Sequence, residues 1–248
     1  YLNALGIYKI LALVAQEGRM LQQINQQIIK SLDQSGRIGQ KVTLIAVSKT
    51  RSLAEILKVY EQGVFNFGEN YVQEAVEKIQ AAQIAGINDI HWHMVGPVQS
   101  NKAKQVADAF DWIHSLSSLR LAKRLNRFRA KQPPLNCCLQ VNIDRAPTKN
   151  GVDPDDEIVL EFAQAFEAFA GLKLRGLMVM PDTHEQTQCA FNQAFKLFER
   201  IKLRLSAKNA ENFDTLSMGM SGDYGLAIEA GSTMVRIGTA IFGPRSTQ

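Results

Sequence analysis

The chain has 248 residues, of which 46% are hydrophobic and 21% are charged. This is ordinary globular composition, enough for one large domain or two small ones. The formal net charge is +4, and the only locally basic stretch, residues 120–131, has the spacing of a solvated helix face. We therefore expect no nucleic-acid partner.

Membrane insertion and a disulfide framework are also disfavoured. No apolar run approaches the length of a membrane span, and the apolar stretch at residues 10–15 lacks the cleavage site of a signal peptide. Three cysteines, Cys137, Cys138 and Cys189, form no disulfide pattern and indicate a reducing compartment. We expect a cytoplasmic protein with no membrane contact.

The chain begins with Tyr1 rather than with a methionine. Met20, followed by Leu-Gln-Gln-Ile-Asn, has the look of a natural start. We therefore expect residues 1–19 to be an extension or a non-native segment, and residues 20–248 to form one domain. Amino-terminal sequencing of the native protein tests this expectation.

Helices and strands are predicted in regular alternation along the chain. The first helix is amphipathic, with apolar residues at helical spacing at Leu21, Ile24, Ile28 and Leu32. Short apolar runs predict strands at 42–48, 64–67, 90–95, 112–116, 135–143, 174–180, 215–218 and 234–237. Helices are predicted at 52–62, 71–85, 118–129, 185–205 and 222–230. Two more are predicted with one open end: one begins near residue 100, and one follows the loop at 151–154 and ends near residue 169. Ser52 and Glu55 match a capping box at the start of the helix after the first strand.

The predicted strands are continuous apolar runs, as in parallel sheets that are covered on both faces. Eight strand–helix units in this length, with no linker between them, predict a single (β/α)8 TIM-type barrel preceded by an amino-terminal helix. A doubly wound open sheet is the alternative.

Polar residues gather at the ends of the predicted strands, where such barrels bind ligands. Lys49 follows the first strand, and Asn70 follows the second. Ser221-Gly222 and Gly238-Thr239 form small-residue turns after the seventh and eighth strands, where backbone N–H groups and hydroxyls can hold a phosphate. Arg236 shares the ligand-facing end of the eighth strand.

Lys49 is the sharpest chemical signal. Strand alternation puts Ile45, Val47 and Lys49 on one face. If that face is the barrel interior, the lysine lies in the mouth; the alternative is a solvated lysine at the start of a loop. A partly desolvated lysine becomes a nucleophilic amine that can form a Schiff base with an aldehyde. A phosphate site across the mouth suggests pyridoxal 5′-phosphate (PLP), which carries both an aldehyde and a phosphate.

Several long segments resemble the pyridoxal phosphate homeostasis proteins, the YggS/PROSC family. The resemblance runs from about residue 42 to about residue 245, and its motifs lie at 46–50, 67–74, 92–102, 217–223 and 235–243. It implies a barrel related to the N-terminal domain of alanine racemase, with PLP attached covalently to Lys49. Family members bind PLP and influence vitamin B6 and amino-acid balance, without an established catalytic turnover.

The resemblance also assigns roles to the candidate residues. Ser221, Gly238 and Thr239 would hold the phosphate, with Gly222 a further candidate beside Ser221, Arg236 would face the pyridine nitrogen, and Asn70 would lie near the ring. His93 is the weakest assignment, because it could simply pack inside the barrel. One departure is the loop at 148–151, which reads Thr-Lys-Asn-Gly where the family more often has Ser-Lys-Ser-Gly.

A racemase needs a base on each face of the substrate, and Lys49 can serve only one. An arginine beside the pyridine nitrogen also makes PLP a weaker electron sink. By resemblance, the second base of alanine racemase, a tyrosine, comes from an additional domain, and this chain ends at Gln248. We therefore expect a monomeric, non-catalytic PLP carrier that supplies PLP-dependent apo-enzymes.

Two other functions remain open: a weak amino-acid racemase-like enzyme that uses Lys49 as a base, and a regulatory module that senses PLP and contacts other macromolecules. A metal site is not expected, because His91 and His93 share a strand face without a third ligand at a suitable spacing.

Overall fold

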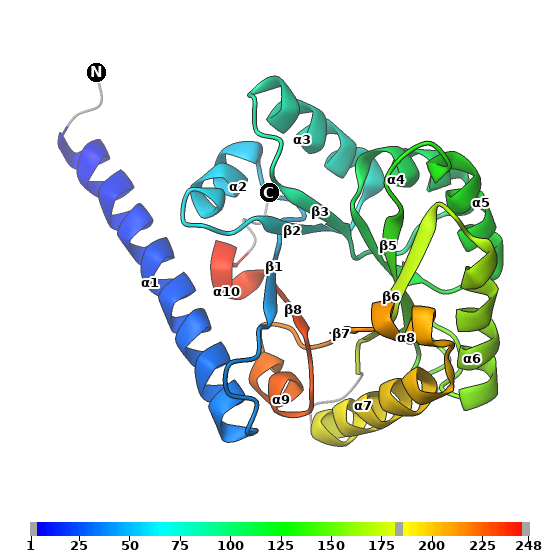
Figure 1. Cartoon of the computed structure of the whole chain (residues 1–248). Coiled ribbons are helices and arrows are strands. Elements are labelled where there is room, and N and C mark those ends of the chain that lie inside the picture. The colour runs from blue at the N-terminus through cyan, green and yellow to red at the C-terminus, as the bar shows by residue number, and fades with distance from the viewer. Residues whose placement is uncertain (1–3, 182–185, 245–248) are drawn as a thin grey trace.

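The computed structural model describes residues 4–181 and 186–244. Eight parallel strands close into a barrel in the order β1 to β8, and helices surround it (Figure 1). Each strand pairs with its neighbours in the chain, and β8 pairs with β1 through the register Ile45–Arg236. The prediction of a (β/α)8 barrel is confirmed, and closure rules out the open sheet.

The strands are β1 Thr43–Val47, β2 Asn66–Glu69, β3 His91–Met94, β4 Trp112–Leu116, β5 Leu135–Val141, β6 Leu172–Val179, β7 Thr215–Ser217 and β8 Met234–Ile237. The α-helices are α1 Ala4–Gln34, α2 Leu53–Tyr60, α3 Val72–Ile84, α4 Ala103–Ala109, α5 Leu119–Arg129, α6 Asp156–Ala165, α7 Thr187–Arg204, α8 Ala207–Asn212, α9 Tyr224–Glu229 and α10 Thr239–Phe242. Short 3-10 helices, η1 Ser100–Lys102 and η2 Phe166–Ala168, adjoin α4 and α6.

The predicted boundaries are close to these, with specific exceptions. The predicted strands at 112–116 and 234–237 are confirmed at both ends, and Ser52 and Glu55 form the predicted capping box. The predicted start of α7 at residue 185 lies outside the described residues. Helix α8 was not predicted, because its six polar and small residues carry no apolar period. The helix predicted from residue 222 begins only at Tyr224, after a turn.

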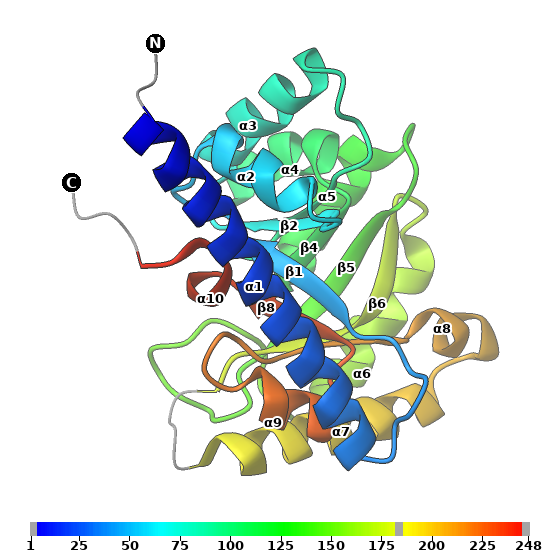
Figure 2. The ribbon, with the colours of Figure 1, turned by 90° about the vertical axis from the view of Figure 1, so that its left-hand side faces the viewer.

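Helix α1 lies along the outside of the barrel, beside α9 and α10 (Figure 2). Its four predicted apolar positions, Leu21, Ile24, Ile28 and Leu32, are all buried. The helix runs without a break through residue 20. The division of the chain at residue 20 stays a prediction.

Apolar side chains form two separate layers. The larger layer lies between the strands and the surrounding helices and includes Ala46, Phe67 and Cys137. The smaller one fills the barrel and consists of Ile45, Trp112, Cys138, Met178 and Met234. Ile45 therefore points inward, as strand alternation requires if Lys49 is to reach the mouth. No helix in the described part of the chain is long and apolar enough to cross a membrane.

Candidate functional site

A cavity of about 460 Å³ opens at the carboxyl ends of the barrel strands. This volume is in the range of small-ligand sites. The cavity brings together seven of the eight predicted site residues: Lys49, Asn70, Ser221, Gly222, Arg236, Gly238 and Thr239. They come from four strand ends that lie far apart in the sequence. The barrel itself therefore assembles the candidate site.

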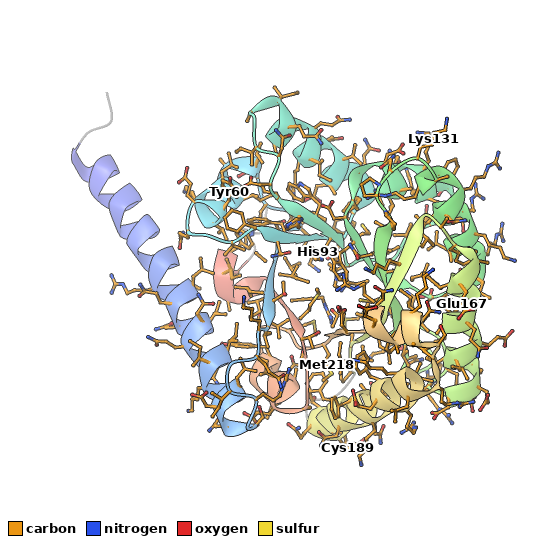
Figure 3. All side chains as sticks on the ribbon, in the orientation of Figure 1. Tyr60, His93, Lys131, Glu167, Cys189 and Met218 are labelled. Carbon is orange, nitrogen blue, oxygen red and sulfur yellow. The ribbon has the colours of Figure 1, made fainter. Side chains whose placement is uncertain are left out.

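His93 does not line this cavity, so the structure does not bring it together with the other seven, and its contact with a cofactor stays a prediction. Its side chain lies within the ring of strands (Figure 3), fully buried, and stacks on Trp112 with 5.5 Å between ring centroids. One ring nitrogen lies 2.9 Å from His114 Nε2 and the other 3.0 Å from Asn66 Oδ1. Burial lowers the pKa of His93 to about 3, so the ring is neutral and packs in the barrel interior.

The turn after β1 fixes the backbone on both sides of Lys49. Thr50 has φ of 64°, a left-handed conformation that a β-branched residue rarely adopts. The Thr50 N–H donates to Glu74 Oε1 at 2.6 Å. On the other side, Lys78 Nζ donates to the Ser48 carbonyl at 2.8 Å. The backbone that carries Lys49 is therefore fixed by hydrogen bonds on both sides.

These contacts belong to a partly buried ionic cluster of Ser48, Glu69, Glu74 and Lys78, which we call the ionic clamp. Lys78 Nζ lies 2.8 Å from Glu69 Oε1 and 2.6 Å from Glu74 Oε1. Ser48 Oγ donates to Glu69 Oε1 at 2.6 Å. Burial raises the pKa of the Glu69 carboxyl, while the charge of Lys78 acts in the opposite direction. Sequence analysis missed the clamp, although Glu74 and Lys78 have the spacing of a helical ion pair.

The cavity wall is cationic. Lys49, Lys149 and Arg236 line it, and no aspartate or glutamate does so among the described residues. Lys149 Nζ donates to the Met180 carbonyl at 2.8 Å and lies 3.3 Å from Asp144 Oδ2. Burial lowers the pKa of Arg236 to about 10, so its guanidinium remains charged at neutral pH. This composition suits an anionic ligand.

Two glycines keep the backbone close to the cavity. A Cβ at Gly96 would collide with the backbone of Asn70, so only glycine lets these two lining segments meet. A Cβ at Gly238 would lie 3.2 Å from the Val47 carbonyl oxygen. The second small-residue turn therefore sits directly against the end of β1, next to Lys49.

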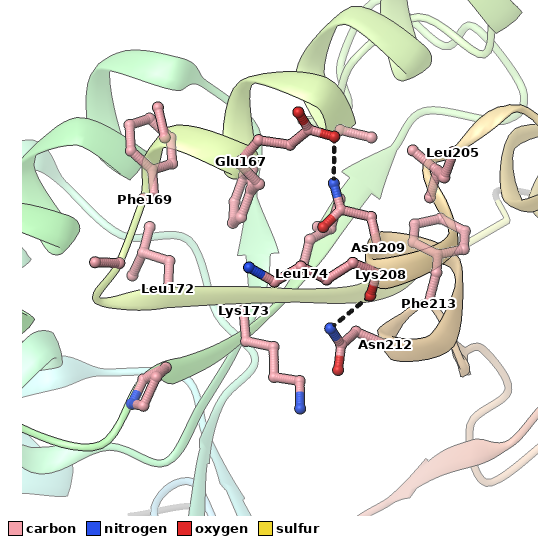
Figure 4. A pocket seen from close by; sticks show the side chains of 15 residues that line it. Glu167, Phe169, Leu172, Lys173, Leu174, Leu205, Lys208, Asn209, Asn212 and Phe213 are labelled. Atoms are coloured by element: carbon pink, nitrogen blue, oxygen red, sulfur yellow. Dashed lines mark hydrogen bonds between the residues drawn. The ribbon is translucent and has the colours of Figure 1, made fainter.

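A second cavity, of about 430 Å³, lies at the opposite end of the barrel, near the beginnings of β5 and β6. Aromatic and aliphatic side chains such as Phe169, Leu205 and Phe213 line it, and Glu167 bonds Asn209 at its edge (Figure 4). It contains none of the predicted site residues. Within residues 4–181 and 186–244, no three His, Cys, Asp or Glu side chains gather in a way that could hold a metal ion.

Comparison with known proteins places the chain in a class. The family model of the alanine racemase N-terminal domain matches residues 25–246. An alanine racemase from Clostridium difficile shares the fold with a TM-score of 0.65 at 12% identity, over 90% of this chain and 60% of the racemase chain. The class is thus the racemase-type barrel.

Relatives with higher sequence identity identify one family within this class. The pyridoxal phosphate homeostasis protein of Haemophilus influenzae is 44% identical, over 90% of this chain and 93% of the relative. That of Escherichia coli is 43% identical, over 91% and 95%. The structure of PipY from Synechococcus elongatus with PLP bound is 35% identical with a TM-score of 0.73, over 87% of this chain and all of PipY. The chain belongs to the pyridoxal phosphate homeostasis protein family.

Proposed function

We propose that this protein binds PLP in the cavity at the carboxyl ends of its strands and acts in PLP homeostasis. One observation carries the proposal: the barrel brings an amine, two small-residue turns and a buried guanidinium to one cationic cavity. PLP has a complementary set of groups, namely an aldehyde, a phosphate and a pyridine nitrogen. The PLP-bound structure of the similar PipY supports the same assignment.

Each lining residue has a role in this proposal. Lys49 Nζ would bond covalently to the aldehyde carbon of PLP, and the aldehyde oxygen would leave as water. Ser221, Gly222, Gly238 and Thr239 bind the phosphate through hydroxyl and backbone N–H donors, and Asn70 lies beside the ring. Arg236 donates to the pyridine nitrogen and, being charged, keeps that nitrogen unprotonated. PLP would supply an electrophilic aldehyde and an electron-withdrawing pyridine ring. The ring withdraws electrons less strongly when its nitrogen is unprotonated.

We further propose that the protein carries PLP rather than catalyses a reaction. A racemase-type reaction needs a second base opposite Lys49, and no tyrosine lines the cavity among the described residues. The carrier is proposed to act as a monomer in the cytoplasm and to supply PLP-dependent apo-enzymes.

Transfer of the cofactor tests this function. The PLP-loaded protein is mixed with an apo-enzyme that needs PLP, in the presence of a scavenger of free aldehyde, and recovery of that enzyme's activity is followed. We expect recovery that exceeds the recovery with an equal amount of free PLP, and Lys49→Ala should abolish the advantage. Equal recovery with free PLP would argue against carriage.

The alternative is a weak amino-acid racemase that uses Lys49 as its base. Its support is the racemase-type fold with a lysine at the mouth of the barrel. Chiral chromatography after incubation with an L-amino acid decides between the two. Sustained formation of the D-isomer, lost in Lys49→Ala, would replace the carrier with the enzyme.

A further inference from the structure

A continuous row of polar side chains fills the centre of the barrel beneath Arg236. Arg236 Nη1 lies 2.7 Å from Ser217 Oγ, and Ser217 Oγ lies 2.9 Å from His114 Nδ1. His114 Nε2 then lies 2.9 Å from His93 Nδ1, and His93 Nε2 lies 3.0 Å from Asn66 Oδ1. We call Asn66, His93, His114 and Ser217 the barrel relay. Its members come from β2, β3, β4 and β7, so the relay crosses the barrel.

The chemistry of the two ends fixes the direction of every hydrogen bond. A guanidinium only donates, so Ser217 Oγ accepts from Arg236. At the far end, Asn66 Oδ1 only accepts, so His93 Nε2 carries a hydrogen. A neutral His93 then accepts at Nδ1 from His114 Nε2–H. Likewise, a neutral His114 accepts at Nδ1 from the Ser217 hydroxyl.

Both histidines are held in the neutral form that this direction needs. Each is fully buried. Burial lowers the pKa of His93 to about 3, and burial, reinforced by the charge of Arg236, lowers the pKa of His114 well below its usual value. A protonated ring would present two donors and break the sequence of bonds. With Asn66 Oδ1 as the acceptor at the far end, the relay is therefore fully bonded in only one arrangement.

The relay determines where the guanidinium of Arg236 can point. Ser217 Oγ takes one of its N–H groups, and the Val179 carbonyl accepts another from Nη2 at 3.1 Å. A guanidinium has five N–H groups, and the residue also lines the cofactor cavity. Two fixed bonds on a planar group set its plane, so the remaining donors have a defined direction.

We propose that the barrel relay positions Arg236, through a one-way row of hydrogen bonds, so that its free N–H donors meet the pyridine nitrogen of the cofactor. The proposal rests on the proposed function, because it assumes PLP in the cavity. Ser217, His114, His93 and Asn66 are thus positioning residues, which act through Arg236 without touching the ligand.

Nitrogen NMR of the cofactor-free protein tests the relay itself. Imidazole ¹⁵N–¹H correlations at neutral pH should show His93 and His114 as neutral rings that carry hydrogen on Nε2. The exposed His91 serves as an internal reference for assigning the imidazole signals. An imidazolium signal, or hydrogen on Nδ1 of either ring, would overturn the relay whether or not the protein binds PLP.

Ligand discrimination tests the positioning of Arg236. Affinity is measured for PLP and for its deaza analogue, in which a CH group replaces the pyridine nitrogen. The wild-type protein should prefer PLP by roughly tenfold or more, as expected for a hydrogen bond from a charged donor. Ser217→Ala should bring this ratio close to one. His114→Gln, which offers one acceptor and one donor, should keep the wild-type preference.

The ratio separates positioning from general structural damage, because a loosened barrel would weaken both ligands equally. An unchanged ratio in Ser217→Ala would overturn the positioning role. If the wild-type protein binds neither ligand, the proposed function fails, and the NMR result alone decides whether the relay exists.

Discussion

Two polar networks adjoin the cavity. Both hold a residue that lines it, one through charged side chains and the other through neutral ones. The ionic clamp supports the turn that carries Lys49 and uses full charges. The barrel relay supports Arg236 and uses neutral side chains. The clamp lies between the strands and α3, whereas the relay lies inside the barrel. Each network thus holds one of the two cations that we propose to contact the cofactor.

The location of each network explains its chemistry. Between strand and helix, the stem of Lys78 reaches from α3 and brings its ammonium to two carboxylates, one of them completely buried. Inside the barrel, Arg236 already supplies a positive charge. A second cation there would be repelled, and the charge of Arg236 indeed contributes to the lowered pKa of His114. A neutral relay is therefore what the interior can accommodate.

The largest expected effect comes from breaking the ionic clamp. Lys78→Met leaves the buried carboxylate of Glu69 without its partner, which should lower the free energy of unfolding by about 3–5 kcal/mol. Urea unfolding measures this loss. Lys104→Met is the matched control, because it breaks an exposed helical pair with Asp108 and should cost about 0.5 kcal/mol or less.

A double variant sharpens this result. Lys78→Met combined with Glu69→Leu removes both buried charges and should recover a large part of the stability that the single variant loses. If Lys78→Met alone is as stable as the wild-type protein, the clamp does not hold the turn.

Acid should weaken the barrel relay. His93 and His114 stay neutral in the folded protein but take up protons in the unfolded chain below about pH 6.5, the ordinary histidine pKa. Their contribution to stability is therefore complete above pH 6.5 and is lost as the pH falls toward 3. The expected slope is about 1.4 kcal/mol per pH unit for each buried histidine.

Urea unfolding over a pH series measures this slope. His114→Gln should reduce the slope of unfolding free energy against pH by the contribution of one buried histidine. The matched control, His91→Gln at an exposed position, should leave the slope unchanged. A slope that is the same in His114→Gln and the wild-type protein would contradict the buried neutral state of His114.

A change outside both networks should have the smallest effect. Ser52→Ala removes the cap of α2 and should cost about 1 kcal/mol. Ser118→Ala, which removes the side-chain cap of α5, should cost about the same. Neither variant should alter PLP affinity, as followed by absorbance. A weaker affinity in Ser52→Ala alone would mean that α2, rather than the ionic clamp, holds the turn at Lys49.

The barrel and most of its mouth could be predicted, because strand ends and small-residue turns are local signals. Lys49 and Arg236 stand at strand ends in the sequence itself. The clamp and the relay could not be predicted in the same way. His93 and His114 lie 21 residues apart, and His114 and Ser217 lie 103 residues apart, so only closure of the barrel brings them together.

The position of His93 away from the cavity lining has the same origin. Strand alternation correctly points this histidine into the barrel, but it does not give depth along the axis. His93 pairs in register with Trp112 and Gly68, and its ring contacts Trp112, His114 and Asn66 in the barrel interior. Lys149 was not predicted to line the cavity, because it lies in a loop rather than at a strand end. Only the folded structure shows that this loop reaches the cavity.

Lys49 is the residue that we propose to hold PLP in this cavity. The most direct test is to add PLP to the purified protein, reduce with borohydride, and map the labelled peptides by mass spectrometry. An absorbance band at about 420 nm should appear before reduction, a general property of PLP joined to an amine, and a single pyridoxyl label should be found on Lys49. A label on Lys149 instead, or one spread over surface lysines, would contradict this assignment.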